Sequence, residues 1–70
     1  MRRRPLESSS LRAAGYDGAR RVLDVEFHTG RIYRYFAVPR EVYTGLLAAA
    51  SKGRYYNAHI RDNYDYDRLA

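Results

Sequence analysis

The sequence predicts an α+β domain, in which a three-stranded antiparallel meander is followed by one long and one short helix packed on one face of the sheet. Apolar and polar residues alternate in "RVLDVEF" (residues 21–27), which is the pattern of a strand with one buried face. After Pro39 the apolar residues recur at helical spacing, with Val42, Leu46 and Ala49 on one stripe. A helix of this kind buries its apolar stripe by packing on a sheet.

Turn residues separate the three predicted strands. The first strand spans residues 10–17 and ends at Asp17-Gly18, a pair that tolerates positive φ and favours a tight turn. The second strand is the alternating segment 21–27. The third follows the turn "HTGR" (28–31) and ends before Pro39. Consecutive strands joined by short turns form an antiparallel meander.

The loop between the second and third strands decides which side chains face the core, because a shift of one residue turns every side chain to the opposite face. A two-residue loop, Thr29-Gly30, would place Arg34 beside Val25. A three-residue loop, residues 28–30 with Gly30 left-handed, instead creates three opposed pairs. These pairs are Tyr33 with Val25, Tyr35 with Leu23, and Arg34 with Asp24. We prefer the three-residue loop, since it buries both tyrosines and pairs opposite charges on the other face.

Two helices are predicted after the sheet. Pro39 suits the first position of a helix, where its missing N–H costs no hydrogen bond. Lys52 and the following Gly53 are typical C-terminal signals, so the first helix should have about 13 residues. In "RYYNAHIRDNY" (54–64) apolar side chains again recur at helical spacing, which indicates a second, shorter helix.

Composition and charge indicate one small domain with a basic tail. The chain has 70 residues, no cysteine and a formal net charge of +5, of which Arg2, Arg3 and Arg4 supply three charges. Residues 1–8 are basic and nearly devoid of apolar side chains, so we expect a disordered basic tail before a single domain at 9–70. No segment is typical of a membrane span or a signal peptide, so we expect a cytoplasmic protein with no membrane partner.

Several spaced motifs resemble those of the KTSC domain, a short module named for its occurrence at the C-terminus of some lysyl-tRNA synthetases and also found as a free-standing bacterial protein. The motifs are "GYD" (15–17), "YRY" (33–35), "VP" (38–39), "SKG" (51–53) and "NAHIR" (57–61), and the resemblance covers about residues 9–66. One departure is Tyr56, where the family often has Phe. The family has no established activity, and its fusion to a tRNA-charging enzyme suggests RNA binding.

Arginines and aromatic residues are the candidates for a nucleic-acid site. Arginines contact phosphate through charge-assisted hydrogen bonds, and exposed aromatic rings on a sheet stack on unpaired bases. Tyr33 and Tyr35 would form such a platform only if they faced away from the helices. In the preferred register they do not, and Phe36 beside Arg34 on the helix-free face is the better candidate. The predicted site residues are Arg2, Arg3, Arg4, Arg31, Arg34, Phe36, Lys52, Arg54 and Arg61.

No catalytic, metal or cofactor site is predicted. Ser8–Ser10 lie where the expected tail meets the first strand, Ser51 lies at a helix end, and the chain has no glycine-rich phosphate loop. Neither His28 nor His59 has a carboxylate or a second histidine at ligand spacing. We therefore expect a protein that is not an enzyme.

Two functions from different classes fit these observations. The first is an auxiliary RNA-binding module, with tRNA as the expected partner. The second is a protein-protein interaction or self-association module, in which a homodimer or another protein would use the open edges of the outer strands. The apolar residues Val22, Ile32 and Phe36 on the helix-free face would contribute to it. We favour RNA because of the arginine content and the family resemblance.

Overall fold

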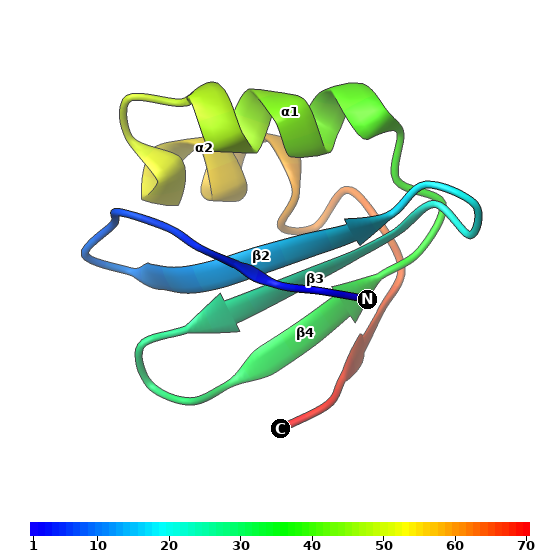
Figure 1. Ribbon diagram of the computed structural model, residues 1–70, viewed down its shortest axis with the longest axis horizontal. Coiled ribbons are helices and arrows are strands. Elements are labelled where there is room, and N and C mark those ends of the chain that lie inside the picture. The colour runs from blue at the N-terminus through cyan, green and yellow to red at the C-terminus, as the bar shows by residue number, and fades with distance from the viewer.

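Both helices lie on one face of a five-stranded antiparallel sheet with the strand order β1-β2-β3-β4-β5 (Figure 1). This computed structural model describes residues 1–70. The elements are β1 (Arg4–Pro5), β2 (Leu11–Asp17), β3 (Val22–Phe27), β4 (Ile32–Tyr35), α1 (Arg40–Ala48), α2 (Lys52–His59) and β5 (Tyr66–Arg68). The predicted α+β class with an antiparallel sheet and two helices is confirmed. The predicted number of three strands is wrong, because each end of the chain adds a short strand. No helix is long and apolar enough to cross a bilayer.

The two added strands cover the edges of the central meander. In β1, Arg4 and Pro5 pair with Ala14 and Ala13 of β2. In β5, Tyr66 to Arg68 pair with Tyr35 to Tyr33 of β4. β1 lies within residues 1–8, for which the sequence predicts a disordered tail. The edges of β2 and β4, which the sequence leaves open for a partner, are therefore occupied by the chain itself.

Gly15 allows the N-terminal segment to lie close to β2. A Cβ atom at this position would be 2.6 Å from the backbone oxygen of Arg2, which is closer than real Cβ contacts. Glycine inside a strand often marks such a close approach of another backbone. The glycine of the "GYD" motif thus serves the packing of the N-terminus on the sheet.

The β3-β4 hairpin has the predicted three-residue loop. Gly30 has a φ of +93°, and its amide donates to the carbonyl oxygen of Phe27. The opposed pairs are Leu23 with Tyr35, Asp24 with Arg34, and Val25 with Tyr33. The register predicted from the sequence is confirmed, and it separates an aromatic face from a charged face.

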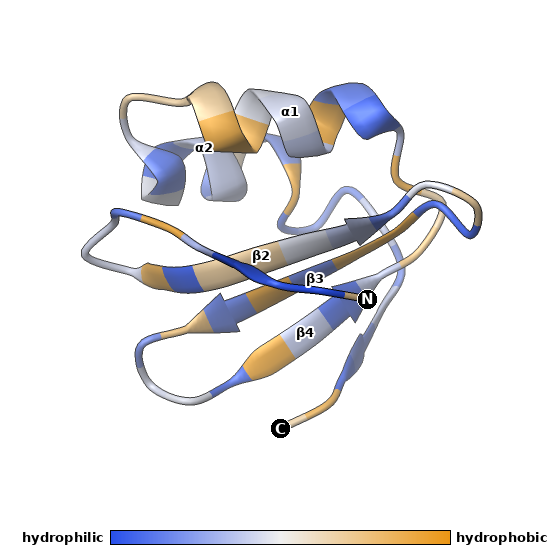
Figure 2. Ribbon diagram, viewed as in Figure 1, coloured by the Kyte–Doolittle hydropathy of each residue, from blue (hydrophilic) through white to orange (hydrophobic).

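The aromatic face packs against the helices and forms the core. In Figure 2 hydrophobic and hydrophilic residues alternate along β3, as expected for a strand with one buried face. The core cluster consists of Leu11, Ala14, Leu23, Val25, Tyr35, Val38, Leu46, Tyr56 and Ile60. Both helices contribute to it, since Leu46 belongs to α1 and Tyr56 to α2.

The helices divide earlier than the sequence predicts. Ala49 is extended with a ψ of 136°, so α1 ends at Ala48 and the long helix of about 13 residues is wrong. Ser51 is the N-cap of α2, and its side chain accepts a hydrogen bond from the Arg54 amide. Lys52 is the first residue of α2, and its ammonium group donates to the carbonyl oxygen of Ala49 at 2.9 Å. The "SKG" motif thus starts the second helix instead of ending the first.

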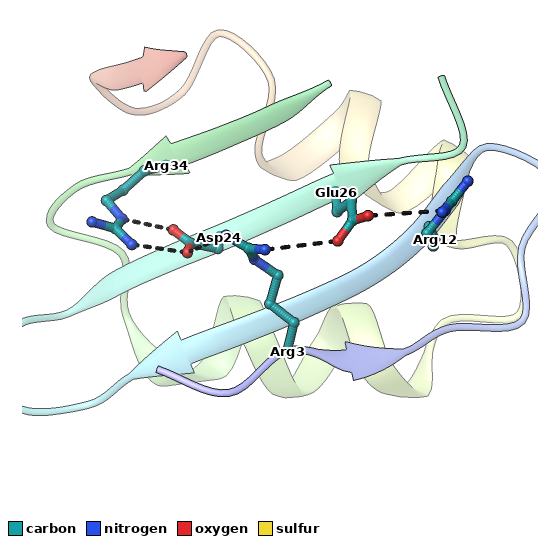
Figure 3. Close-up of polar contacts among 5 residues, drawn as sticks. All are labelled: Arg3, Arg12, Asp24, Glu26 and Arg34. Carbon is teal, nitrogen blue, oxygen red and sulfur yellow. Dashed lines mark hydrogen bonds and ion pairs between the residues drawn. The ribbon is translucent and has the colours of Figure 1, made fainter. Parts of the chain in front are cut away.

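The charged face carries an ion-pair network centred on Asp24 (Figure 3). The Asp24 carboxylate is only 1% exposed and accepts from Arg34 at 2.8 and 3.0 Å. The hydrogen bond to Asp24 raises the pKa of Arg34 above its ordinary value. Arg3 reaches the same carboxylate at 3.4 Å. The network therefore joins β4, β3 and the N-terminal segment.

Glu26 extends this network toward β2. It lies 3.7 Å from Arg3 and 3.9 Å from Arg12 (Figure 3). Arg3 thus contacts both carboxylates of β3, which ties the N-terminal segment to the face of the sheet. Such partly buried, shared ion pairs are less screened than isolated pairs on a surface.

Substitution of Asp24 tests the contribution of this network to stability. Asp24→Asn should lower the free energy of unfolding by roughly 2 kcal/mol, because hydrogen bonds to charged groups contribute about 1.5–3 kcal/mol. Asp65→Asn removes an exposed carboxylate and should change that free energy by less than about 0.5 kcal/mol. Urea unfolding followed by circular dichroism measures both variants, and equal effects would show that the network is not stabilising.

Candidate functional site

A cavity of about 750 Å³ lies between α2 and the sheet. Five aromatic side chains line it, and these are Phe27, Tyr33, Tyr35, Tyr56 and Tyr66. Its volume is within the range of about 300–1,000 Å³ that is typical of small-molecule sites. We call it the aromatic cavity.

The five rings form one continuous cluster. Tyr33 lies edge-on to Tyr66 with ring centroids 5.5 Å apart, and edge-on to Phe27 at 5.8 Å. Tyr35 lies 5.7 Å from Tyr66 and 6.2 Å from Tyr56. Tyr35 and Tyr56 are buried, Tyr33 and Phe27 are half-buried, and Tyr66 is 57% exposed. The cavity therefore has a buried aromatic floor and an accessible aromatic wall.

Regular structure places these rings. Tyr33 and Tyr35 are alternate residues of β4 and face the helices, while Tyr66 stands opposite Tyr35 in β5. The β4-β5 pairing continues beyond the strands, because the Ile32 carbonyl accepts from the amide of Leu69 at 2.7 Å. The C-terminal segment is thus fixed beside the cavity by backbone hydrogen bonds.

The cavity floor holds a pair of tyrosine hydroxyl groups. The hydroxyl oxygens of Tyr35 and Tyr56 are 2.5 Å apart. Burial raises the pKa of Tyr35, and the hydrogen bond to Tyr56 raises it further. Burial also raises the pKa of Tyr56. Both phenols are therefore protonated at neutral pH, and one of them donates the hydrogen bond that joins the pair.

Two arginines without an ion-pair partner line the same cavity. Arg31 precedes β4 and Arg61 follows α2, and both are exposed. None of the four ion pairs of the protein includes either of them. The Arg61 amide still donates to the carbonyl oxygen of Tyr56, and the left-handed Asp62 (φ 66°) then turns the chain away from α2. Asp62 also lines the cavity, so its charged side chains sum to one positive charge.

The comparison with known proteins establishes the family. The model of the KTSC domain matches residues 7–64 of this chain. The chain belongs to the KTSC domain family. The crystal structure of a KTSC domain protein from Yersinia pestis has a TM-score of 0.93 and 30% sequence identity, over 99% of this chain and 97% of that chain. The predicted family resemblance is therefore confirmed.

Relatives of this KTSC domain occur both alone and within larger proteins. An uncharacterized protein of Stutzerimonas stutzeri is 49% identical over 70 residues, which are 99% of both chains. A lysine-tRNA ligase of Nostoc sp. is 38% identical over 64 residues, which are 91% of this chain and 11% of the ligase. This KTSC domain therefore matches only a small part of that enzyme.

The structure brings only part of the predicted site together. Arg31 and Arg61 both line the aromatic cavity. Lys52 and Arg54 line a second, smaller hollow beside residues 7–10. That hollow shares three residues with the aromatic cavity, and these are Ser10, Gly53 and Asn57.

The other predicted residues lie away from the cavity. Arg3 and Arg34 belong to the ion-pair network on the opposite face. Arg2 and Arg4 are exposed in the N-terminal segment that pairs with β2. Phe36 is 36% exposed just beyond β4. None of these five residues lines the aromatic cavity.

Three of the five aromatic residues of the cavity are not among the sequence candidates: Tyr56 lies in the predicted second helix, Phe27 in the predicted second strand, and Tyr66 outside every predicted element. Tyr33 and Tyr35 face the helices as predicted, and on that side both line the cavity. The sequence excludes them as a stacking platform for that orientation, because it does not predict a cavity between the helices and the sheet. The segment "NYDYDR" (63–68) does alternate aromatic and charged residues, which is a strand pattern and could have indicated β5. A short strand paired with β4 would have placed Tyr66 beside Tyr35.

The buried phenols predict a loss of stability at alkaline pH. A phenol whose pKa is higher in the folded protein than its ordinary value of 10.0 adds stability that is fully present below pH 10 and is lost as the pH rises above it. Above pH 10, each such phenol should lower the free energy of unfolding by about 1.4 kcal/mol per pH unit. Tyr56→Phe should make this loss shallower, as measured by urea unfolding between pH 8 and about pH 11. If the free energy of unfolding of Tyr56→Phe had the same pH dependence as that of the unmodified protein, ionisation of Tyr56 would not contribute to the loss of stability.

Proposed function

We propose that this KTSC domain binds single-stranded RNA, with tRNA as the expected class, through the aromatic cavity. One observation supports the proposal most directly: two arginines without ion-pair partners line the same cavity as five aromatic rings. Rings that stack on bases, combined with cations that contact the backbone, are the common means by which proteins bind single strands.

The rings supply binding energy that does not depend on base identity. Stacking of one base on an aromatic side chain contributes about 1–3 kcal/mol. Tyr66 is the most accessible of the five rings, and Tyr33 beside it is half-buried. An unpaired base would therefore stack on the rings of Tyr66 and Tyr33 first.

The cations supply the contacts to phosphate. Arg31 and Arg61 have exposed guanidinium groups, which can form paired hydrogen bonds to a phosphate group. Lys52 and Arg54 in the adjoining hollow, with Arg2 and Arg4 at the N-terminus, would add weaker contacts along a longer strand.

The helix-free face is a less suitable site than the sequence suggests. Arg34 forms two hydrogen bonds to Asp24, and Arg3 contacts both Asp24 and Glu26. A phosphate bound there would compete with these two carboxylates and be repelled by them. Phe36 lies just beyond β4 and is 36% exposed, but it does not line the aromatic cavity.

The lysine-tRNA ligase of Nostoc sp. adds support from outside the structure. Its name states that it joins lysine to tRNA, and a segment of it is similar to 91% of this chain. A domain attached to such an enzyme is well placed to contact tRNA. This argument is one of association, so the proposal depends mainly on the cavity.

The alternative, a protein interaction or self-association module, is less well supported. The outer strands are β1 and β5 instead of β2 and β4. β1 contains Pro5, which has no N–H to donate, and β5 contains the charged residues Asp67 and Arg68. Proline and charged residues on short edge strands oppose the addition of another strand.

Single arginine substitutions test the proposed phosphate contacts. Arg31→Ala and Arg61→Ala should each weaken binding of a labelled single-stranded RNA by about tenfold at about 50 mM salt and lower the salt dependence by about 0.7 in the logarithmic slope. Arg20→Ala removes an exposed charge outside the cavity and should weaken binding less than about twofold. Fluorescence anisotropy measures all three. Equal losses of affinity in all three variants would show that binding depends on net charge alone. If the unmodified protein did not bind the RNA, the proposed function would be refuted.

The aromatic wall is tested at its most exposed residue. Tyr66→Ala should weaken RNA binding at least about fivefold, because it removes one stacking contact of about 1–3 kcal/mol. Leu69→Ala removes an exposed apolar side chain from the same C-terminal segment and serves as the matched control. The result that would contradict the proposal is a loss of affinity in the Leu69 variant as large as in the Tyr66 variant.

A further inference from the structure

The floor of the aromatic cavity contains a buried hydroxyl proton without an acceptor. Tyr35 is 3% exposed and Tyr56 is 8% exposed, and their hydroxyl oxygens are hydrogen-bonded only to each other. Two hydroxyl groups carry two protons, and only one of them can lie between the two oxygens. The second proton therefore has no acceptor within the protein.

A hydroxyl proton that lines the cavity and has no acceptor in the protein indicates what a ligand should provide. A ligand that displaced water from this proton without accepting it would leave the donor unsatisfied, which is unfavourable. A bound group with a carbonyl oxygen or an unprotonated ring nitrogen avoids this by accepting the proton. Burial raises the pKa of both phenols, so the proton is present over the whole neutral range.

The walls and the rim restrict the ligand further. The rings of Tyr33, Tyr66 and Phe27 favour a flat unsaturated ring over a flexible chain. Arg31 and Arg61, which have no ion-pair partner, favour an anion outside the floor. An inorganic anion would make no use of the rings, and an uncharged apolar molecule would neither accept the hydroxyl proton nor contact the arginines.

We propose that the aromatic cavity binds one unpaired nucleoside 5′-phosphate unit. The base lies against the rings of Tyr33 and Tyr66 and accepts a hydrogen bond from the Tyr35-Tyr56 hydroxyl pair. The phosphate contacts Arg31 and Arg61. This inference rests on the proposed function, because it assigns one nucleotide of the RNA to the same cavity. The same chemical unit is also present in a free nucleotide, so the experiment includes both sources.

Four probes separate the parts of this unit. They are adenosine 5′-monophosphate, adenosine, ribose 5-phosphate and a single-stranded hexaadenylate RNA. Each is titrated into the full chain while the backbone amide signals are followed by NMR. Adenosine 5′-monophosphate should bind more tightly than adenosine or ribose 5-phosphate, and the largest shifts should lie in β4, β5 and α2.

Two double variants remove one feature each. Tyr35→Phe with Tyr56→Phe removes both hydroxyl groups and keeps both rings, so it should weaken adenosine 5′-monophosphate and adenosine by about tenfold and leave ribose 5-phosphate unchanged. Arg31→Ala with Arg61→Ala should weaken adenosine 5′-monophosphate and ribose 5-phosphate and leave adenosine unchanged. Tyr43→Phe, which does not alter the cavity, is the control. Dispersed amide spectra show that each variant is folded.

The outcomes distinguish the inference from the proposed function. Binding of hexaadenylate without binding of the mononucleotide would overturn the inference and leave RNA binding to another surface. Binding of the mononucleotide without hexaadenylate would support the nucleotide site, refute the RNA function and identify the ligand as a free nucleotide. Unchanged affinity for adenosine in the double phenylalanine variant would overturn the role of the hydroxyl pair.

Discussion

The register of the β3-β4 hairpin determines the arrangement of the rest of the molecule. A loop of three residues with Gly30 at a φ of +93° sets Asp24 opposite Arg34 and places Tyr33 and Tyr35 on the other face. A slip of one residue would turn every side chain of β4 over. The tyrosines would then face away from the helices, and Arg34 would face the core without a carboxylate partner. The hairpin loop thus selects both the core and the charged face.

The two faces then have different roles. On the charged face, Asp24 and Glu26 form ion pairs with Arg3, Arg12 and Arg34. Of these three, Arg3 fastens the N-terminal segment to the sheet. On the aromatic face, the core closes around Tyr35 and Tyr56 but leaves a cavity beside Tyr33 and Tyr66. A chain of this length has a small core, and large aromatic side chains fill it efficiently. The same aromatic residues that stabilise the core therefore also line the candidate site.

The sequence predicts those features that depend on local pattern. The hairpin register follows from the glycine position and from the alternation of β3, and the family follows from spaced motifs. β1 and β5 are harder to predict than the hairpin. Strands of two or three residues gain their stability from the neighbouring strand and not from their own composition. The helix break at Ala49 was missed because a serine N-cap and a lysine-glycine C-terminal signal overlap in "SKG". Residues from β2, β3, the β3-β4 loop, β4, α2 and β5 line the cavity, and no single segment of the sequence predicts that they come together.

The most direct test of this account is an NMR measurement of cross-strand contacts in the free protein. The three-residue loop predicts backbone nuclear Overhauser effects that pair Asp24 with Arg34 and Val25 with Tyr33. Cross-strand effects that instead pair Val25 with Arg34 would show a two-residue loop and the opposite facing of β4. That result would contradict the burial of the tyrosines, the ion-pair network and the aromatic cavity together.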